Sequence, residues 1–117
     1  MSDTIAAIAT GAQVAAIGII RISGPKSLPI VDRLFRPVSG KLMSGYEDRK
    51  LVYGRLTDRS GELLDLCLCT VSHAPHSYTG EDTAELQCHG SPTVLRAALE
   101  ELFHAGARQA LPGEFTK

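Results

Sequence analysis

The sequence contains no tryptophan, and aromatic residues make up only 5% of its 117 positions. A folded core therefore has to be built mainly from aliphatic side chains and alanine, and the hydrophobic fraction of 44% is enough for one globular domain. No apolar run approaches the ~18 residues of a membrane-spanning helix. Asp3 stands where a secretion signal has a basic region, so we expect a cytoplasmic protein.

Clustered basic residues are also missing. The net charge is −1, which argues against a domain that binds nucleic acid by itself, because neutralisation of the phosphates needs clustered Lys and Arg. The three cysteines, Cys67, Cys69 and Cys88, are too few and odd in number for a disulfide framework. A zinc site that combines Cys67 and Cys69 with His73 and His89 lacks the paired C-x₂₋₄-C spacing. We therefore predict buried, inert cysteines and no metal site.

Hydrophobic periodicity divides the chain into strands and helices. Strand-like runs cover residues 4–10, 16–23, 50–58, 63–73 and 82–89, and a weaker run begins at 107. Apolar residues with helical spacing occur over 24–37 and 91–106. This order, with a hairpin at 59–62, predicts a single α+β domain over residues 1–117. In it, about two to three helices pack on a mixed β-sheet.

Proline, serine and glycine locate the ends of the two helices. Pro29 has to lie in the first turn of the first helix, so this helix starts near Ser27, and Pro37 ends it. In the second helix, Ser91 is suited to the N-cap and Gly106 to the position after the last turn. The second helix therefore has the clearest boundaries in the chain.

Two kinds of catalytic motif are incomplete. A phosphate-binding loop needs G-x-x-x-x-G-K-[ST], and Pro25 breaks this pattern before Lys26, so no nucleotide site is predicted. Serines and histidines gather between positions 72 and 89, which leaves open a small hydrolase that uses His89 or His76 with a nearby serine. The G-x-S-x-G elbow is absent, and a polar loop explains the same composition.

Arg21 lies in the strand at 16–23, which carries isoleucine on both faces and is expected to be central and covered on both sides. Alternation puts Arg21 on the same face as Ile17 and Ile19, where a guanidinium is costly unless it has water or an anion. One interpretation is a side chain at the rim with its head in solvent. The other is a paired arginine, bound to Glu85 or to a ligand carboxylate.

Glu85 lies in the stretch SYTGEDTAELQCHGSP (77–92), whose strand has one apolar and one polar face. The polar face carries Thr83, Glu85, Gln87 and His89. A solvent-facing strand explains this pattern. A pocket lined by Glu85, Gln87 and His89 explains it equally well, because a carboxylate there could accept N–H groups of a flat nitrogen heterocycle.

Four blocks of the sequence resemble one protein family. They are DTIAAIAT (3–10), IGIIRISGP (17–25), SYTGEDTAELQCHGSP (77–92) and GARQALPGEFTK (106–117). Through them nearly the whole chain resembles the N-terminal domain of the MnmE/TrmE family of tRNA-modification GTPases. The motifs SYTGED…E…HG and GAR.A.PGEFT are the most specific part of this resemblance.

The resemblance implies a domain that binds a reduced folate, is similar to the folate domain of glycine-cleavage T-protein, and forms homodimers. The folate, 5-formyl- or 5,10-methylene-tetrahydrofolate, would be the one-carbon source. In this family GTP hydrolysis, with potassium and magnesium, belongs to a separate domain. Together with the MnmG protein, family members modify carbon-5 of the wobble uridine in tRNA. A segment without the phosphate-binding loop is not expected to be catalytic alone, so no catalytic residue is predicted.

The same resemblance implies folate contacts for Arg21, in the IIRISG block, and Glu85, in the ELQCHG block. Glu85 would hold the N–H groups of the pterin ring and Arg21 an anionic or carbonyl part of the ligand. GAQVAA (11–16) replaces the usual Pro- and Gly-rich run, and Ser91 replaces a glycine. The chain resembles a fragment that stops at Lys117, before a further folate-contacting lysine. The alternative is a dimerisation module that has lost folate binding, because the altered run changes the loop.

Overall fold

The computed structural model describes residues 3–9, 17–75, 77 and 79–116. The elements, in chain order, are β1 (Ile5–Ile8), β2 (Ile17–Ser23), α1 (Ser27–Leu34), β3 (Phe35–Pro37), η1 (Met43–Gly45), β4 (Val52–Thr57), β5 (Leu63–Ser72), β6 (Thr83–His89), α2 (Pro92–His104), β7 (Arg108–Gln109) and η2 (Glu114–Thr116). The η elements are single turns of 3-10 helix.

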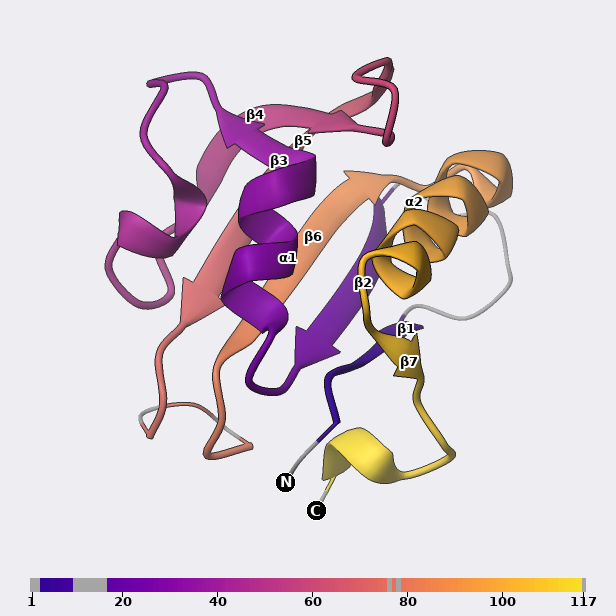
Figure 1. Ribbon diagram of the computed structural model, residues 1–117. Coiled ribbons are helices and arrows are strands. Elements are labelled where there is room, and N and C mark those ends of the chain that lie inside the picture. Colours follow the sequence, from indigo (N-terminus) through magenta and orange to yellow (C-terminus); the bar gives the residue numbers. More distant parts are fainter. Residues whose placement is uncertain (1–2, 10–16, 76, 78, 117) are drawn as a thin grey trace.

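All seven strands belong to one sheet in the order β3-β4-β5-β6-β2-β1-β7. Neighbouring strands are antiparallel except β1 and β7, which are parallel. Both α-helices lie on the same face of the sheet (Figure 1). This two-layer arrangement confirms the predicted α+β fold with a mixed sheet.

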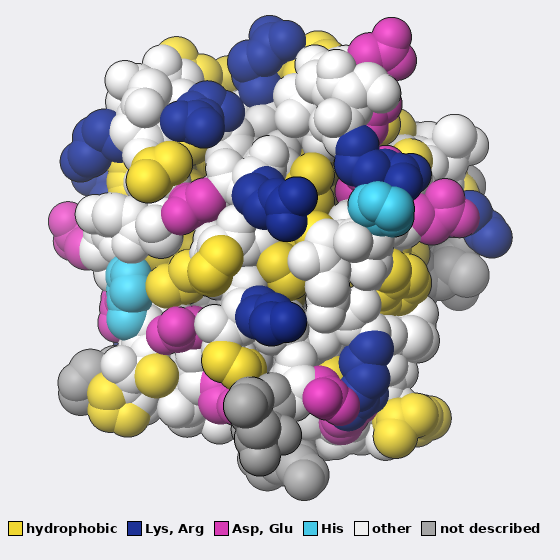
Figure 2. Space-filling model, in the orientation of Figure 1, with side chains coloured by type: hydrophobic (Ala, Val, Ile, Leu, Met, Phe, Trp, Pro, Cys, Tyr) yellow, Lys and Arg dark blue, Asp and Glu magenta, His cyan; other side chains and the backbone are white. Residues whose placement is uncertain are grey.

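The core lies between the sheet and the two helices. Alternate residues of the central strands, such as Ile20 and Ile22 of β2, point into it and are fully buried. Helix α2 packs closely on β2 because Gly18 has no side chain: a Cβ there would lie 2.5 Å from Cδ1 of Leu95. On the face seen in Figure 2, Lys and Arg side chains are interspersed with Asp and Glu.

The predicted boundaries of α2 are confirmed. Ser91 is the N-cap, and its hydroxyl accepts a hydrogen bond from the backbone N–H of Val94 at 3.5 Å. Gly106 follows the helix with a φ of +127°, a conformation that side-chain-bearing residues rarely adopt. No helix in the described residues is long and apolar enough to cross a membrane.

The first helix is shorter than predicted. It begins at Ser27 with Pro29 in its first turn, as expected, but it ends at Leu34 instead of Pro37. Phe35–Pro37 forms β3, which pairs with β4. The residue that directly precedes Pro37 is disfavoured in helical geometry. Phe35 has an extended backbone, and its side chain is buried in the core. The β3 pairing therefore replaces the last helical turn.

The prediction that β2 is covered on both sides is wrong. Its helix side is buried, but on the opposite face Ile17 is 54% exposed and Ile19 is only partly buried. Both helices pack on the same side, so the chain leaves the other face of the sheet open (Figure 1). The isoleucines on the second face of β2 are therefore not covered by another layer of the described residues.

Candidate functional site

Arg21 and Glu85 are direct neighbours on the open face of the sheet. Their strands β2 and β6 pair antiparallel, with Arg21 opposite Glu85. The guanidinium Nε donates to Glu85 Oε2 at 2.8 Å, with the side chains 41% and 24% exposed respectively. The structure thus pairs Arg21 with Glu85, one of the two anions considered from the sequence. Such a partly exposed pair adds little to stability.

The other oxygen of Glu85 is available to a ligand. In the described residues Glu85 is bonded only through Oε2, so Oε1 can still accept a hydrogen bond. Thr70 of β5 lies directly opposite Glu85 on its other side. The Thr70 hydroxyl is buried and has no hydrogen-bond partner among the residues that the structure describes. A buried hydroxyl without a partner is costly, so it is a second group on this row that a ligand could satisfy.

Two cavities flank the ion pair. One, of about 350 Å³, is lined by Arg21, by the end of β1 and by residues 110–115. The other, of about 290 Å³, is lined by Glu85, Thr70, Gln87 and Arg49 together with neighbouring apolar side chains. The site therefore offers a guanidinium on one side, a carboxylate and a hydroxyl on the other, and concave surface beside each.

The sequence did not point to Thr70. It lies in a strand of ordinary alternation and belongs to no motif, and only the pairing of β5 with β6 brings it beside Glu85. Gln87 lines the same cavity as Glu85, as the pocket interpretation expected, whereas His89 does not line it. His89 instead pairs with Asp65, through Nδ1 and Oδ1 at 2.7 Å.

The described histidines and cysteines are not arranged as a hydrolase, or a zinc site of Cys67, Cys69, His73 and His89, would need. His73 Nδ1 contacts Asp48 Oδ1 at 2.5 Å, and His89 contacts Asp65. Among the described residues neither ring bonds a serine hydroxyl or lies in a metal-ligand group with Cys67 and Cys69. His76 and the run 11–16 lie outside the described residues.

All three cysteines are buried free thiols, as predicted. Burial raises the pKa of Cys69. For Cys67 the hydrogen bond with Cys88 contributes most, with burial second, and both raise its pKa. The Cys67 and Cys69 thiols are therefore protonated at neutral pH.

Residues 4–117 match the family described as "GTP-binding protein TrmE N-terminus". The chain belongs to this family. Curated relatives named tRNA modification GTPase MnmE include those of Symbiobacterium thermophilum (48% identical over 115 residues), Bacteroides fragilis (47% over 116) and a Synechococcus species (44% over 118). The matches cover 98% or 99% of this chain and 24% or 25% of each relative. The TrmE N-terminal chain thus spans about a quarter of its relatives' length.

The last block of the TrmE N-terminal chain forms one wall of the Arg21 cavity. Arg108 of β7 donates through Nε to Asp3 Oδ2 at 2.7 Å and forms a two-point ion pair with Glu114. Glu114 also accepts the backbone N–H of Leu111 at 2.7 Å. These bonds hold the PGEF turn against β1, which places residues 110–115 beside Arg21.

Proposed function

We propose that this chain is the reduced-folate-binding and dimerisation domain of a tRNA-modification GTPase. The observation that carries the proposal is the row formed by Thr70, Glu85 and Arg21 between two cavities on the open face of the sheet. Within the described part of the chain, it combines a carboxylate oxygen and a buried hydroxyl that have no hydrogen-bond partner with a guanidinium, all on three neighbouring strands.

These groups fit the polar edge of a pterin. The free Oε1 of Glu85 would accept N–H groups of the ring, and the Thr70 hydroxyl would bond the same edge. Arg21 is bonded to Oε2 and also lines the neighbouring cavity, where its guanidinium would hold a carbonyl or anionic part of the ligand. A bound 5-formyl- or 5,10-methylene-tetrahydrofolate would supply the one-carbon unit.

The wider role belongs to the whole protein. The curated relatives are named tRNA modification GTPases and are about four times as long as this chain, so we place GTP hydrolysis, with its potassium and magnesium, in another part of the protein. With the MnmG protein, the full-length protein would modify carbon-5 of the wobble uridine of tRNA in the cytoplasm. In that scheme this domain binds the folate and carries no catalytic residue of its own.

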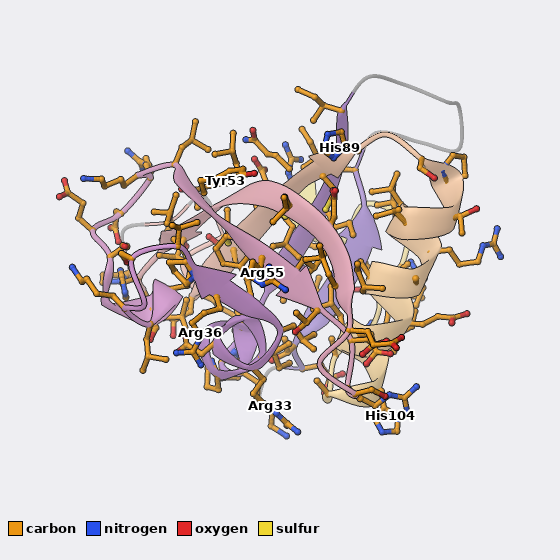
Figure 3. The ribbon with its side chains drawn as sticks, turned by 90° about the horizontal axis from the view of Figure 1, so that it is seen from above. Arg33, Arg36, Tyr53, Arg55, His89 and His104 are labelled. Atoms are coloured by element: carbon orange, nitrogen blue, oxygen red, sulfur yellow. The ribbon has the colours of Figure 1, made fainter. Side chains whose placement is uncertain are left out.

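The open face also supports a homodimer. Tyr53 of β4, Leu66 of β5 and Ile17 of β2 are all markedly exposed there. In Figure 3 Tyr53 lies on the side of the sheet away from α1. Apolar surface of this kind, rimmed by Arg21, Glu85 and other polar groups, is typical of a protein–protein interface.

Calorimetric titration of 5-formyltetrahydrofolate into the 117-residue chain tests the proposal. We expect saturable binding near one ligand per chain, at least ~10-fold weaker binding for Glu85→Gln, and weaker binding for Thr70→Val. Both variants should keep the unfolding midpoint, since the ion pair is partly exposed and the hydroxyl is unpartnered. Glu62→Gln, an exposed glutamate on the β4–β5 turn, is the matched control.

Equal affinity of the wild type and Glu85→Gln would contradict the assigned site. A chain that dimerises but does not bind the ligand at millimolar concentration would favour the alternative function, a dimerisation module without folate.

A further inference from the structure

Three metal-ligating side chains meet on the helix side of the sheet, away from the Arg21–Glu85 row. A carboxylate oxygen of Asp65 and the sulfurs of Cys67 and Cys88 all lie within 4.8 Å of one another. Asp65 and Cys67 are two residues apart on β5, so they share a face. Cys88 comes from β6, directly opposite Cys67 by continuation of the Leu68–Gln87 pairing.

The three groups are largely shielded from solvent. The two thiols are 4% and 2% exposed, and the Asp65 side chain beside them is only 10% exposed. Within the described residues no Lys or Arg pairs with Asp65, and its negative charge raises the pKa of Cys67. Both oxygens of this carboxylate have His89 as their hydrogen-bond partner, and a divalent cation bound beside the two thiols would be a further partner for its charge.

The donor set indicates which cation fits. Two thiolates and one carboxylate suit zinc, and cytosolic cysteines that converge in this way bind metal more often than they form disulfides. Tetrahedral zinc holds sulfur at ~2.3 Å and oxygen at ~2.0–2.2 Å, which sets ligand atoms roughly 3.5–4 Å apart. The present spacing therefore requires movements of roughly 1 Å or less to close on the ion.

A neighbouring histidine supports the carboxylate as in known zinc sites. The backbone N–H of His89 donates to Asp65 Oδ2 at 2.8 Å, and its Nδ1 lies 2.7 Å from Oδ1. Hydrogen bonds of this kind orient a ligating carboxylate. His89 is itself 74% exposed, at the end of β6 on the side away from α1 (Figure 3), so the residue that holds Asp65 is in contact with solvent.

We propose that Cys67, Cys88 and Asp65 form a binding site for zinc or a similar thiophilic divalent ion, with His89 as the group that positions Asp65. Binding forms two metal–sulfur bonds and one metal–oxygen bond, and releases the two thiol protons to solvent. Water completes the fourth position. The ion would link β5 to β6 beside the start of α2 and stabilise the fold by mass action.

Cobalt substitution tests this site directly. Co²⁺ is titrated into the reduced, metal-free chain, and the sulfur-to-cobalt charge-transfer absorption is recorded. We expect a saturable band near one ion per chain. Cys67→Ser and Cys88→Ser should lose most of it, and Asp65→Asn and His89→Gln should weaken affinity, the latter ~10–100-fold. The matched control is Cys69→Ser, since Cys69 is buried on the same face of β5 but outside the group, and it should keep the band.

Zinc binding is measured in parallel by thermal unfolding. Zinc should raise the unfolding temperature of the wild type and Cys69→Ser but not that of Cys67→Ser or Cys88→Ser. If serine unfolds the core, the alanine variants at the same three positions provide the comparison. Absence of the cobalt band at millimolar metal, or a band equally intense in Cys67→Ser and Cys88→Ser, would overturn the proposal.

Discussion

At the scale of single residues, the site depends on groups that are incompletely satisfied. Glu85 uses one oxygen for Arg21, and the buried hydroxyl of Thr70 has no partner among the described residues. Such a row on the open face adds little to the stability of the fold, because the ion pair is partly exposed and the hydroxyl has no partner in the described part of the chain. The residues are therefore better explained by a ligand than by stability.

Other single residues matter only for packing, and Gly54 of β4 is the clearest case. A Cβ at this position would lie 2.5 Å from the backbone oxygen of Arg36 and 2.6 Å from Cζ of Phe35. We expect Gly54→Ala to lower the free energy of unfolding by about 1–3 kcal/mol, because the β3 backbone has to move away. Urea unfolding measures this loss.

The control for Gly54 is Gly45→Ala in η1, where nothing lies within 4 Å of the added carbon. It should change the free energy of unfolding by less than about 0.5 kcal/mol. Equal effects of the two substitutions would show that β3 is not packed against β4 as described.

At the scale of elements, the segment between β3 and β4 is fastened to the sheet by His73, at the end of β5. The ring contacts Asp48 through Nδ1 at 2.5 Å and the backbone oxygen of Ser44 through Nε2 at 2.9 Å. Ser44 in turn bonds Asp32 of α1 through its backbone N–H at 2.9 Å. The imidazole thus connects this irregular segment to the sheet, and Ser44 connects the same segment to α1.

This connection predicts a pH dependence of stability. The hydrogen bond with Asp48 is the main cause that raises the pKa of His73 above 6.5. A raised folded-state pKa adds stability below pH 6.5, and this contribution is lost as the pH rises through the folded-state pKa. The unfolding midpoint of the wild type should therefore fall relative to that of His73→Gln as the pH rises above 6.5.

Denaturant titrations at several pH values measure the difference, with His104→Gln as the control on the surface of α2. Parallel pH profiles for the wild type and His73→Gln would contradict the proposed role of the Asp48 contact.

At the scale of the whole molecule, both α-helices of the described residues lie on the same face of the sheet. The open face holds the Arg21–Glu85 row beside exposed apolar side chains from β2, β4 and β5. A second copy of the chain packed on this face would bury the apolar surface and could narrow the flanking cavities. The proposed dimer and the proposed folate site therefore share one surface.

A charge placed on that surface should separate the copies. We expect Leu66→Lys to convert the dimer to a monomer without loss of the fold, because a buried unpaired ammonium is costly at an interface. Sedimentation velocity with circular dichroism measures both properties. Thr93→Lys adds the same charge to the exposed side of α2 and should leave the dimer intact. A wild-type chain that is monomeric at high concentration would contradict the dimer.

Local sequence signals determined the elements whose ends are chemically marked. Ser91 and Gly106 delimit α2 as expected, and the alternation around Glu85 separates its buried and open faces correctly. The motifs of residues 77–92 and 106–117 also determined the family. These features depend on caps, turns and period-two patterns, which act within a few residues of the chain.

Tertiary structure alone decided the rest. Pairing of β3 with β4 ended α1 at Leu34, and the common side of the two helices left one face of the sheet open. Strand register joined Arg21 to Glu85, placed Thr70 beside them, and brought Cys88 to Asp65 and Cys67, a set that spacing rules along one strand do not reveal. Register between distant strands is chosen by how whole faces pack, so the periodicity of any single strand cannot specify it.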